Sequence, residues 1–483
     1  SCFQVKAQAF SATSTQSLHL KAAGDSDLAI MLSSASIKFE QQLFVRASSI
    51  LSCSKAPIGH SKFAPLTART FSHRAARNLA TAATMARELG HERFHGPAVW
   101  TGEDLKNSEW WGHQLSKDDI DDLHQATEAA KAKGVVQWVA PGVPDMIAKE
   151  DFPLGPNMVQ KLARLSTELE DGKGLAMIAN FPVSDPRFTE DDLAVAYLGV
   201  SAYIGHIVLQ SSSGLRSVTR GYGMPLGRIQ AEMTGETPKG GKQTNNHFRY
   251  HTDRCDVISL LSIRTAPSGG FSRVASAPAI YNAMMERCPE LAKALCQPID
   301  RIWEGENGFF RLPVWDMTPE GKFTTQFSPS YVENAQFLEN TIKATPTQIK
   351  ALDAIESIGM ELGAEYQAKP GSMYFLNNHQ VYHGRGNWSV TEKETQGDWG
   401  KSGRLLLRTW ISPFNSRSLP DTDQYRFVYG NVKGGQKRGG YDQAIHTGEV
   451  PKPQMPADHV YYSLYDQEVQ QRSMNGRAAT FLS

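Results

Sequence analysis

The stretch Phe-Arg-Tyr-His-Thr-Asp-Arg-Cys-Asp (248–256) decides how this 483-residue chain is interpreted, because it sets a histidine and an aspartate two positions apart. On a β-strand, residues i and i+2 project from the same face, so His251 and Asp253 can aim at one point. A second histidine, His383, lies far downstream in Asn-Asn-His-Gln-Val-Tyr-His-Gly-Arg (377–385). Arriving on a distant strand, it would complete two imidazoles and one carboxylate, a set that binds divalent metals.

Two arginines follow that histidine in Gly-Arg-Leu-Leu-Leu-Arg-Thr-Trp (403–410). Arg404 and Arg408 are four positions apart in an apolar, strand-like run, so both can face one cavity. A buried arginine is costly unless it is paired, and its planar fork matches a carboxylate in two parallel bonds. Each arginine could pair with a structural carboxylate. Given the histidines upstream, we expect at least one of them to bind an anionic ligand.

These residues together indicate one of three classes of protein. Two histidines and one carboxylate leave one face of an Fe(II) octahedron open, as in non-haem iron oxygenases, and a 2-oxo acid and dioxygen can fill that face. Catalytic zinc also takes three protein ligands and a water, so a zinc hydrolase is an alternative. A catalytically silent barrel that binds a metabolite is another. The arginine pair argues against the hydrolase, because hydrolysis needs no clamp for a 2-oxo acid.

Further motifs extend the pattern in a fixed order. The stretch 248–256 is followed by Ser-Gly-Gly-Phe-Ser-Arg-Val-Ala-Ser (268–276), by Pro-Gly-Ser-Met-Tyr-Phe-Leu-Asn-Asn (370–378), by His383-Gly-Arg and by Arg-Leu-Leu-Leu-Arg-Thr-Trp (404–410). In these motifs the chain resembles the TauD/TfdA (taurine dioxygenase-like) family of Fe(II)- and 2-oxoglutarate-dependent oxygenases, and it is most similar to the fungal branch. The resemblance covers nearly all of residues 94–415.

The resemblance implies an α+β fold with a double-stranded β-helix core, jelly-roll and cupin-like, and flanking helices. It implies that the metal ligands are His251, Asp253 and His383. By the same resemblance Arg404 would clamp the distal carboxylate of 2-oxoglutarate, with Ser272 as a second anchor. Arg408 would stand where family members can contact an anionic group of the substrate. The interval between His383 and Arg404 is longer than in compact members, so Arg408 stays an alternative for the clamp.

The implied reaction consumes Fe(II)-bound 2-oxoglutarate and O2, yields succinate and CO2, and oxidises a C–H bond of a small metabolite. Hydroxylation is the expected outcome, with desaturation and ring closure as alternatives that depend on substrate geometry. Because Asp253 is retained, no metal position is vacated for a halide, and halogenation is disfavoured. The family includes enzymes of secondary metabolism, which this chain is expected to join, and the substrate is expected to be a small molecule that can carry an anionic group.

Composition excludes several other classes. The formal net charge is zero and no basic run interleaves with aromatic residues, so nucleic acid is a poor partner. A membrane-spanning helix needs a run of about eighteen apolar residues, and the chain contains no such run, so a membrane partner is not expected. The five cysteines are too few and too irregular for a disulfide scaffold, which favours a reducing, cytoplasmic location. The pattern does not indicate an oligomeric state.

The chain divides into three segments by composition. Residues 1–84 hold three acidic residues against nine lysines and arginines, and are rich in serine and alanine. They are predicted to be a disordered extension that stems from the gene model, or else a targeting segment. A targeting segment would place the protein in mitochondria. The resemblance implies that residues 94–440 are the TauD/TfdA-like dioxygenase domain, and 441–483 are predicted to be an irregular C-terminal tail.

Helix and strand signals within the domain are local. Caps and apolar periods predict helices at 117–133 and 157–170, and further helices after Thr189 and Thr345. Strands are predicted at 257–264, 372–377 and 405–411. His379, four positions before His383, could border the pocket or serve as a structural histidine.

Overall fold

The computed structural model describes residues 89, 93–108, 113–210, 223–230, 247–302, 309–338, 340–389 and 403–440. All of these belong to one compact unit, residues 72–483. The segments 1–84 and 441–483, for which the sequence predicts an extension and a tail, lie outside the described residues.

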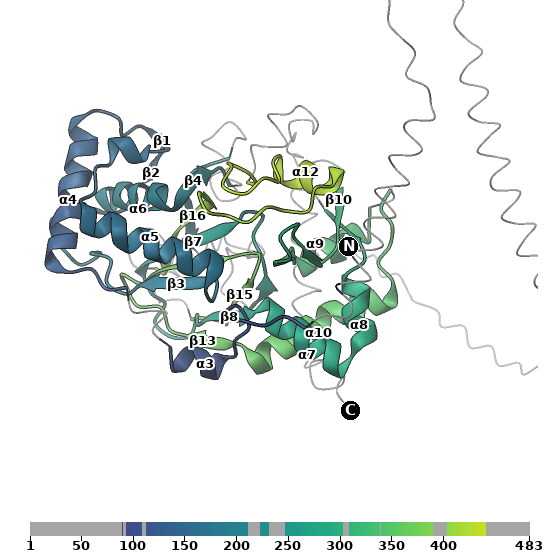
Figure 1. Cartoon of the computed structure of the whole chain (residues 1–483). Coiled ribbons are helices and arrows are strands. Elements are labelled where there is room, and N and C mark those ends of the chain that lie inside the picture. Colours follow the sequence, from purple (N-terminus) through teal and green to yellow (C-terminus); the bar gives the residue numbers. More distant parts are fainter. Residues whose placement is uncertain are drawn as a thin grey trace, which may run out of the picture. The chain divides into compact units, whose positions relative to one another are not determined.

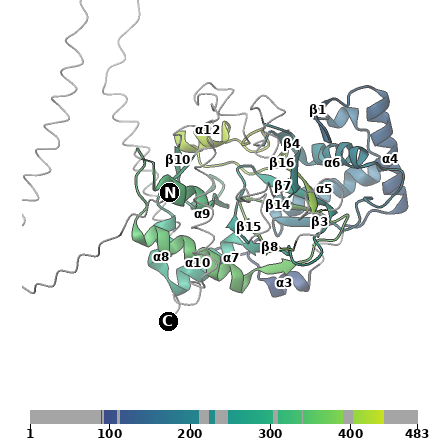
Figure 2. The same cartoon turned by 180° about the vertical axis from the view of Figure 1, so that it is seen from behind.

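Two antiparallel β-sheets form the centre of the described structure (Figure 1, Figure 2). The larger sheet has the strand order β3-β14-β7-β16-β4, with β5 also paired to β16, and the smaller has the order β13-β8-β15-β6. The strands of the larger sheet are β3 (Leu175–Ile178), β14 (Met373–Asn377), β7 (Val257–Arg264), β16 (Leu405–Pro413), β4 (Gly205–Val208) and β5 (Gly227–Gln230). Those of the smaller sheet are β13 (Ala364–Tyr366), β8 (Ser272–Ser276), β15 (Val381–Arg385) and β6 (Phe248–His251).

The central strands of the larger sheet, β14, β7 and β16, are buried on both faces because both faces are covered. Along β16, Leu405 and Leu407 pack into a core with the helices, whereas Leu406 and Trp410 pack into the core between the two sheets. This alternation follows the period of two along a strand. Arg408 has the same phase as Leu406, so its side chain enters the space between the sheets. The predicted strand pattern therefore decides which side chains reach the interior.

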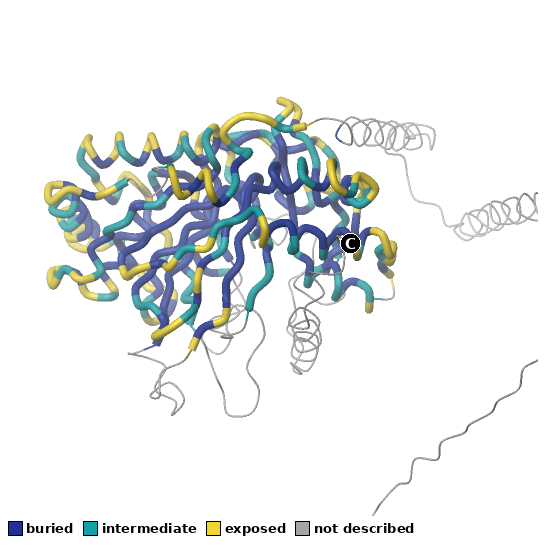
Figure 3. The backbone as a smooth tube through the Cα atoms, turned by 90° about the horizontal axis from the view of Figure 1, so that it is seen from below, coloured by how far each residue is buried: buried dark blue, intermediate teal, exposed yellow. Residues whose placement is uncertain are grey.

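Two groups of helices cover the outer faces of the sheets. The core on the larger sheet is completed by α4 (Lys117–Ala132), α5 (Pro156–Asp171) and α6 (Glu190–Ile204). The core on the smaller sheet is completed by α7 (Ala277–Arg287), α8 (Pro289–Leu295) and α10 (Pro346–Leu362). Figure 3 shows buried residues along the central strands and exposed residues along the outer helices. None of the helices in the described ranges has the length and apolar character needed to cross a membrane.

Side-chain caps fix where the predicted helices begin. Reciprocal capping boxes start three of them, at Ser116 with Asp119, Thr189 with Asp192, and Thr345 with Gln348. Each box satisfies backbone N–H groups that have no partner within the helix, and each contributes about 1 kcal/mol. The predicted helices and the three predicted strands are all present, with ends shifted by at most a few residues.

Short elements complete the described chain. Around the two sheets lie α3 (Gly102–Lys106), β1 (Trp138–Ala140), β2 (Val143–Pro144), the 3-10 helix η1 (Lys149–Asp151), β9 (Ile299–Ile302), β10 (Phe309–Leu312), β11 (Trp315–Met317), β12 (Phe323–Thr325), α9 (Pro329–Ala335) and α12 (Asp423–Tyr429). The two facing antiparallel sheets with helices outside confirm the predicted α+β class with a double-stranded β-helix core.

Candidate metal centre and anion pocket

His251, Asp253 and His383 meet at one point at the edge of the smaller sheet. His251 is the last residue of β6 and pairs in register with His383 of β15, and their ring centroids are 4.2 Å apart. One potential ligand atom from each of the three residues lies within 4.8 Å of the others. The predicted convergence of two histidines and one aspartate from distant segments is therefore present in the fold.

The geometry that brings Asp253 to this point differs from the expected one. The prediction put His251 and Asp253 on one strand face, and this is wrong, because β6 ends at His251. The backbone N–H of Asp253 donates to Oδ1 of Asn378 at 3.0 Å instead of joining a sheet ladder. Asp253 thus reaches the metal position from a loop that a side chain of the β14–β15 turn holds in place.

The two imidazoles are held neutral, as metal ligands must be. Burial lowers the pKa of His251, and burial together with His251 lowers the pKa of His383 to about 3. Nδ1 of His251 lies 2.9 Å from the carbonyl oxygen of Arg249 and donates to it, which leaves Nε2 as a lone-pair donor. Nδ1 of His383 is buried and makes no hydrogen bond to the described residues. Neutral, partly unpartnered imidazoles beside a carboxylate fit a divalent cation.

Asp253 is ionised and is held by two donors on one oxygen. Arg408 Nη1 and Trp410 Nε1 donate to its Oδ2 at 3.1 and 2.9 Å. Burial would raise the pKa of Asp253, but the charge of Arg408 and the hydrogen bond from Trp410 lower it, and the pKa falls to about 2. Both of these bonds go to Oδ2. Oδ1 makes no hydrogen bond within the described ranges, so it can coordinate a cation.

Arg404 lies in a cavity that also reaches the metal position. Ser272, Tyr374, His251 and His383 line the same cavity. The Arg404 side chain is buried, stacks at 5.6 Å over the ring of Trp388, and makes no hydrogen bond or ion pair with the described part of the chain. Burial lowers its pKa from the usual arginine range.

The hydroxyl groups in this cavity are arranged beside Arg404. Ser272 Oγ and Tyr374 Oη are 3.2 Å apart and hydrogen-bonded. A buried cation with hydroxyl groups next to it and no ion pair to an acid among the described residues is suited to a carboxylate that enters from outside.

Arg408 lines the cavity but is already engaged. Its Nε donates to Gln210 Oε1 at 2.6 Å, in addition to the bond from Nη1 to Asp253. The two predicted anion-binding arginines therefore face one cavity in different states. The contact of Arg408 with an anionic substrate stays a prediction. Most of the long interval between His383 and Arg404, residues 390–402, lies outside the described residues.

Sequence reasoning missed several residues of the cavity. Arg385 lines it two residues after His383, so the strand period could have placed both on one face. Tyr374 stands in a motif that the sequence analysis quoted without a role. Trp410, which bonds Asp253, ends the motif 404–410 that was also quoted without a role for it. Gln210 bonds Arg408 from a distant part of the chain, and no local signal marks it.

The fold is a jelly roll, and its cavity is suited to a divalent metal and a carboxylate. The chain belongs to the family described as "Taurine catabolism dioxygenase TauD, TfdA family", which matches residues 139–410, more than half of the chain. Its members are dioxygenases that use Fe(II), 2-oxoglutarate and O2, so the enzyme class and the cofactors predicted from the sequence are confirmed.

The individual relatives share less than 30% of their residues with this chain. The chain is 27% identical to "FR-33289 synthase" of Streptomyces rubellomurinus over 337 residues, which are 67% of this chain and 92% of that protein. It is 23% identical to "Taurine hydroxylase-like protein SAT17" of Stachybotrys chartarum over 72% of this chain and 86% of that protein. Among solved structures, asparagine oxygenase with Fe(II), hydroxyasparagine and succinate matches at a TM-score of 0.46 and 14% identity, covering 62% of this chain and 92% of that chain.

Proposed function

We propose that His251, Asp253 and His383 hold Fe(II), that Arg404 and Ser272 hold the distal carboxylate of 2-oxoglutarate, and that the enzyme hydroxylates a C–H bond of a small metabolite. The observation that carries this proposal is the pairing of two sites in one cavity. Neutral imidazoles and an ionised carboxylate converge at one end, and a buried arginine that makes no ion pair with a described acid stands at the other.

The chain's own side chains would act by binding and orienting. Arg404 offers a planar fork to a carboxylate. Ser272 Oγ can donate to the same carboxylate when Tyr374 Oη is the donor in the hydrogen bond between the two hydroxyl groups. Arg408 and Trp410 hold Oδ2 of the Asp253 carboxylate, so Oδ1 would be the oxygen available to bind the metal. The bound iron supplies the oxidising chemistry with O2 and 2-oxoglutarate, and the protein supplies position and a dry site.

Apolar residues of the larger sheet would keep water out of the cavity that holds Arg404 and the proposed metal ligands. Ile258, Leu260 and Leu406 line the cavity opposite the metal-binding residues. In such surroundings, the interaction between Arg404 and a carboxylate is stronger than it would be in water. A small substrate that enters the cavity would meet this lining and the ring of Phe248, which also lines it.

We assign the substrate to small metabolites and the reaction to hydroxylation. A family relative carries the name of a hydroxylase-like protein, which supports this reaction type.

The described cysteines Cys255, Cys288 and Cys296 are free thiols, which supports a reducing compartment.

The test is anaerobic reconstitution of the protein with Fe(II) and 2-oxoglutarate. The expected result is a metal-to-ligand charge-transfer band, followed on exposure to O2 by one succinate for each 2-oxoglutarate consumed. Zn(II) in place of Fe(II) serves as the control and should give neither signal. Well-folded protein that binds Fe(II) but shows no band with 2-oxoglutarate would contradict the proposal.

A further inference from the structure

Asp256, three residues after Asp253, is the centre of a buried charge cluster outside the cavity. Its Oδ1 lies 2.7 Å from His379 Nε2, and its Oδ2 accepts a hydrogen bond from Ser412 Oγ at 3.0 Å. Arg438 Nε donates to both carboxylate oxygens, at 3.0 and 2.9 Å. Asp256 is 1% exposed and Arg438 0% exposed. We call Asp256, His379, Ser412 and Arg438 the carboxylate cluster.

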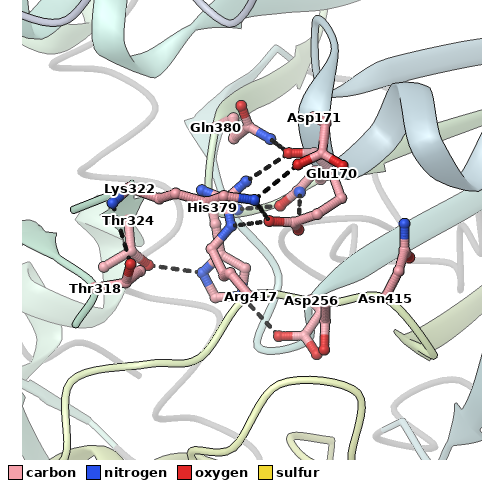
Figure 4. Close-up of polar contacts among 12 residues, drawn as sticks. Glu170, Asp171, Asp256, Thr318, Lys322, Thr324, His379, Gln380, Asn415 and Arg417 are labelled. Carbon is pink, nitrogen blue, oxygen red and sulfur yellow. Dashed lines mark hydrogen bonds and ion pairs between the residues drawn. The ribbon is translucent and has the colours of Figure 1, made fainter. Parts of the chain in front are cut away.

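The cluster holds one buried anion against one buried cation. Burial lowers the pKa of His379, so this imidazole is neutral. Its Nε2–H therefore donates to Asp256, and its Nδ1 accepts from Thr324 Oγ1 at 2.8 Å. Burial would raise the pKa of Asp256, but Arg438 and His379 outweigh it and lower that pKa to about 2. Figure 4 shows His379 between Thr324 and Asp256.

The cluster is bonded directly to the loop that carries Asp253. Asn378, next to His379 in the β14–β15 turn, donates its backbone N–H to the carbonyl of Asp256 at 2.8 Å. The Asn378 side chain accepts from the backbone N–H of Asp253 at 3.0 Å and donates to the carbonyl of Cys255 at 3.0 Å. The same turn leads into β15, which carries His383. Two of the three segments that form the metal position are thus joined through this turn.

Arg438 reaches the cluster from a segment beyond the family match. That match ends at residue 410, and the chain then leaves β16 and passes through α12 before Arg438. Arg438 Nη2 donates to the carbonyl of Arg417 at 2.6 Å, and the backbone N–H of Gly440 donates to the carbonyl of Arg254 at 2.9 Å. The segment 414–440 therefore packs against the loop 252–256. Among the described residues, Arg438 of this segment is the only arginine that bonds Asp256.

We propose that Asp256, His379 and Arg438 are positioning residues for the metal site, and that the segment 414–440 takes part in iron binding through Arg438. The inference rests on the proposed role of Asp253 as a metal ligand. A loop that is ordered before the metal arrives does not have to lose conformational freedom when the metal binds. Partners outside the ligand shell typically change metal affinity by about 10- to 100-fold, and the cluster is expected to act within this range.

The test compares two buried carboxylates that each pair with an arginine. Asp256→Asn removes the charge at the cluster, and Asp300→Asn removes it from a carboxylate that is equally buried, at 1% exposure, and is bonded to Arg311 and to the backbone N–H of Ile342. Both variants should lower the melting temperature. Only Asp256→Asn should raise the Kd for Fe(II), by about 10-fold or more, measured by anaerobic titration, and weaken the charge-transfer band with 2-oxoglutarate.

A second variant keeps the charge and covers the case in which Asp256→Asn does not fold. Arg438→Lys retains the cation but loses the fork, so it should raise the Kd for Fe(II) by a smaller factor, about threefold to tenfold. In metal-free protein, Arg438→Lys should also speed hydrogen exchange of the peptide that contains Asp253, relative to a peptide from β9.

The outcomes separate this inference from the proposed function. If the wild type forms the charge-transfer band and Arg438→Lys binds Fe(II) within about twofold of it, the positioning role is overturned while the iron site stands. Equal weakening by Asp300→Asn would overturn it as well, because the effect would then follow stability alone. A wild type without the band would remove the proposed function itself.

Discussion

Arg404 immediately precedes β16 and Arg408 is the fourth residue of that strand, and both line one cavity. They differ in whether their charge is paired. Arg408 donates to Asp253 and Gln210, so its charge is compensated within the protein. Arg404 is as deeply buried, at 7% exposure for each, and makes no ion pair with the described residues. A paired buried cation belongs to the scaffold, whereas an unpaired one is costly until a ligand brings the missing charge. This difference supports our proposal that Arg408 acts at the metal end of the cavity and Arg404 at the co-substrate end.

Asp253→Ala should give the largest change, because it removes both a proposed ligand and the partner of Arg408. We expect Fe(II) affinity to fall by more than about 100-fold and the charge-transfer band to disappear. Anaerobic titration of Fe(II), followed by absorption with 2-oxoglutarate, measures both. Retention of near wild-type Fe(II) affinity would mean that the metal binds elsewhere.

Arg404→Met should separate the two ends of the cavity. Loss of a bidentate, charge-assisted pair is expected to raise the Kd for 2-oxoglutarate by about 100-fold and to leave Fe(II) affinity within about threefold. Because the methionine removes a buried cation that makes no ion pair with the described residues, the ligand-free variant should melt at a higher temperature than the wild type. Calorimetric titration and thermal melting, with and without 2-oxoglutarate, test both statements. A lower melting temperature would show that Arg404 is paired in the free protein.

The stability of the metal-free protein should fall as the pH is lowered through the ordinary histidine range. The folded-state pKa of His383 is about 3, whereas an unfolded histidine titrates near pH 6.5. Between these values the unfolded chain binds more protons, so stability is lost as the pH falls, by about 2 kcal/mol from roughly pH 6.5 to 5. Denaturant melts across this range measure the slope. His383→Gln should make the slope shallower, and an unchanged slope would assign the proton uptake to other groups.

Arg408→Met should have a smaller effect on binding than Arg404→Met. It should weaken Fe(II) binding more than 2-oxoglutarate binding, which is the reverse of the effect of Arg404→Met. The Asp253 carboxylate would lose one of its two donors, so the Kd for Fe(II) is expected to rise by about 10-fold, with little change in the affinity of the iron-loaded enzyme for 2-oxoglutarate. The melting temperature of the free protein should fall, because Asp253 is left without its cation. If Arg408→Met weakened 2-oxoglutarate binding more than Arg404→Met did, the two roles would be exchanged.

Local patterns predicted much of the fold from the sequence. Serine and threonine caps with an acid or glutamine three residues later started three helices where they were expected. The apolar run 405–411 predicted a strand, and the strand found there, Leu405–Pro413, is buried on both faces. These signals succeed because each depends on residues close together in the chain.

The parts that were missed depend on contacts between distant segments. Asp253 was expected on a strand, but the side chain of Asn378 takes up its backbone N–H and holds it in a loop. The state of Arg408 depends on Gln210, which the sequence places 198 residues away. Arg438 carries no motif, and only the fold brings it to Asp256. Motif order identified the family and its ligand types, but it could not assign partners to each charge.

The most direct test of the central claim is an anaerobic crystal structure with Fe(II) and 2-oxoglutarate, with anomalous diffraction measured at the iron edge. The account predicts one iron peak within coordination distance of His251, Asp253 and His383, and a carboxylate of 2-oxoglutarate that accepts two hydrogen bonds from Arg404. An iron peak away from these three residues, or a co-substrate carboxylate bound to Arg408 with Arg404 left unpaired, would contradict it.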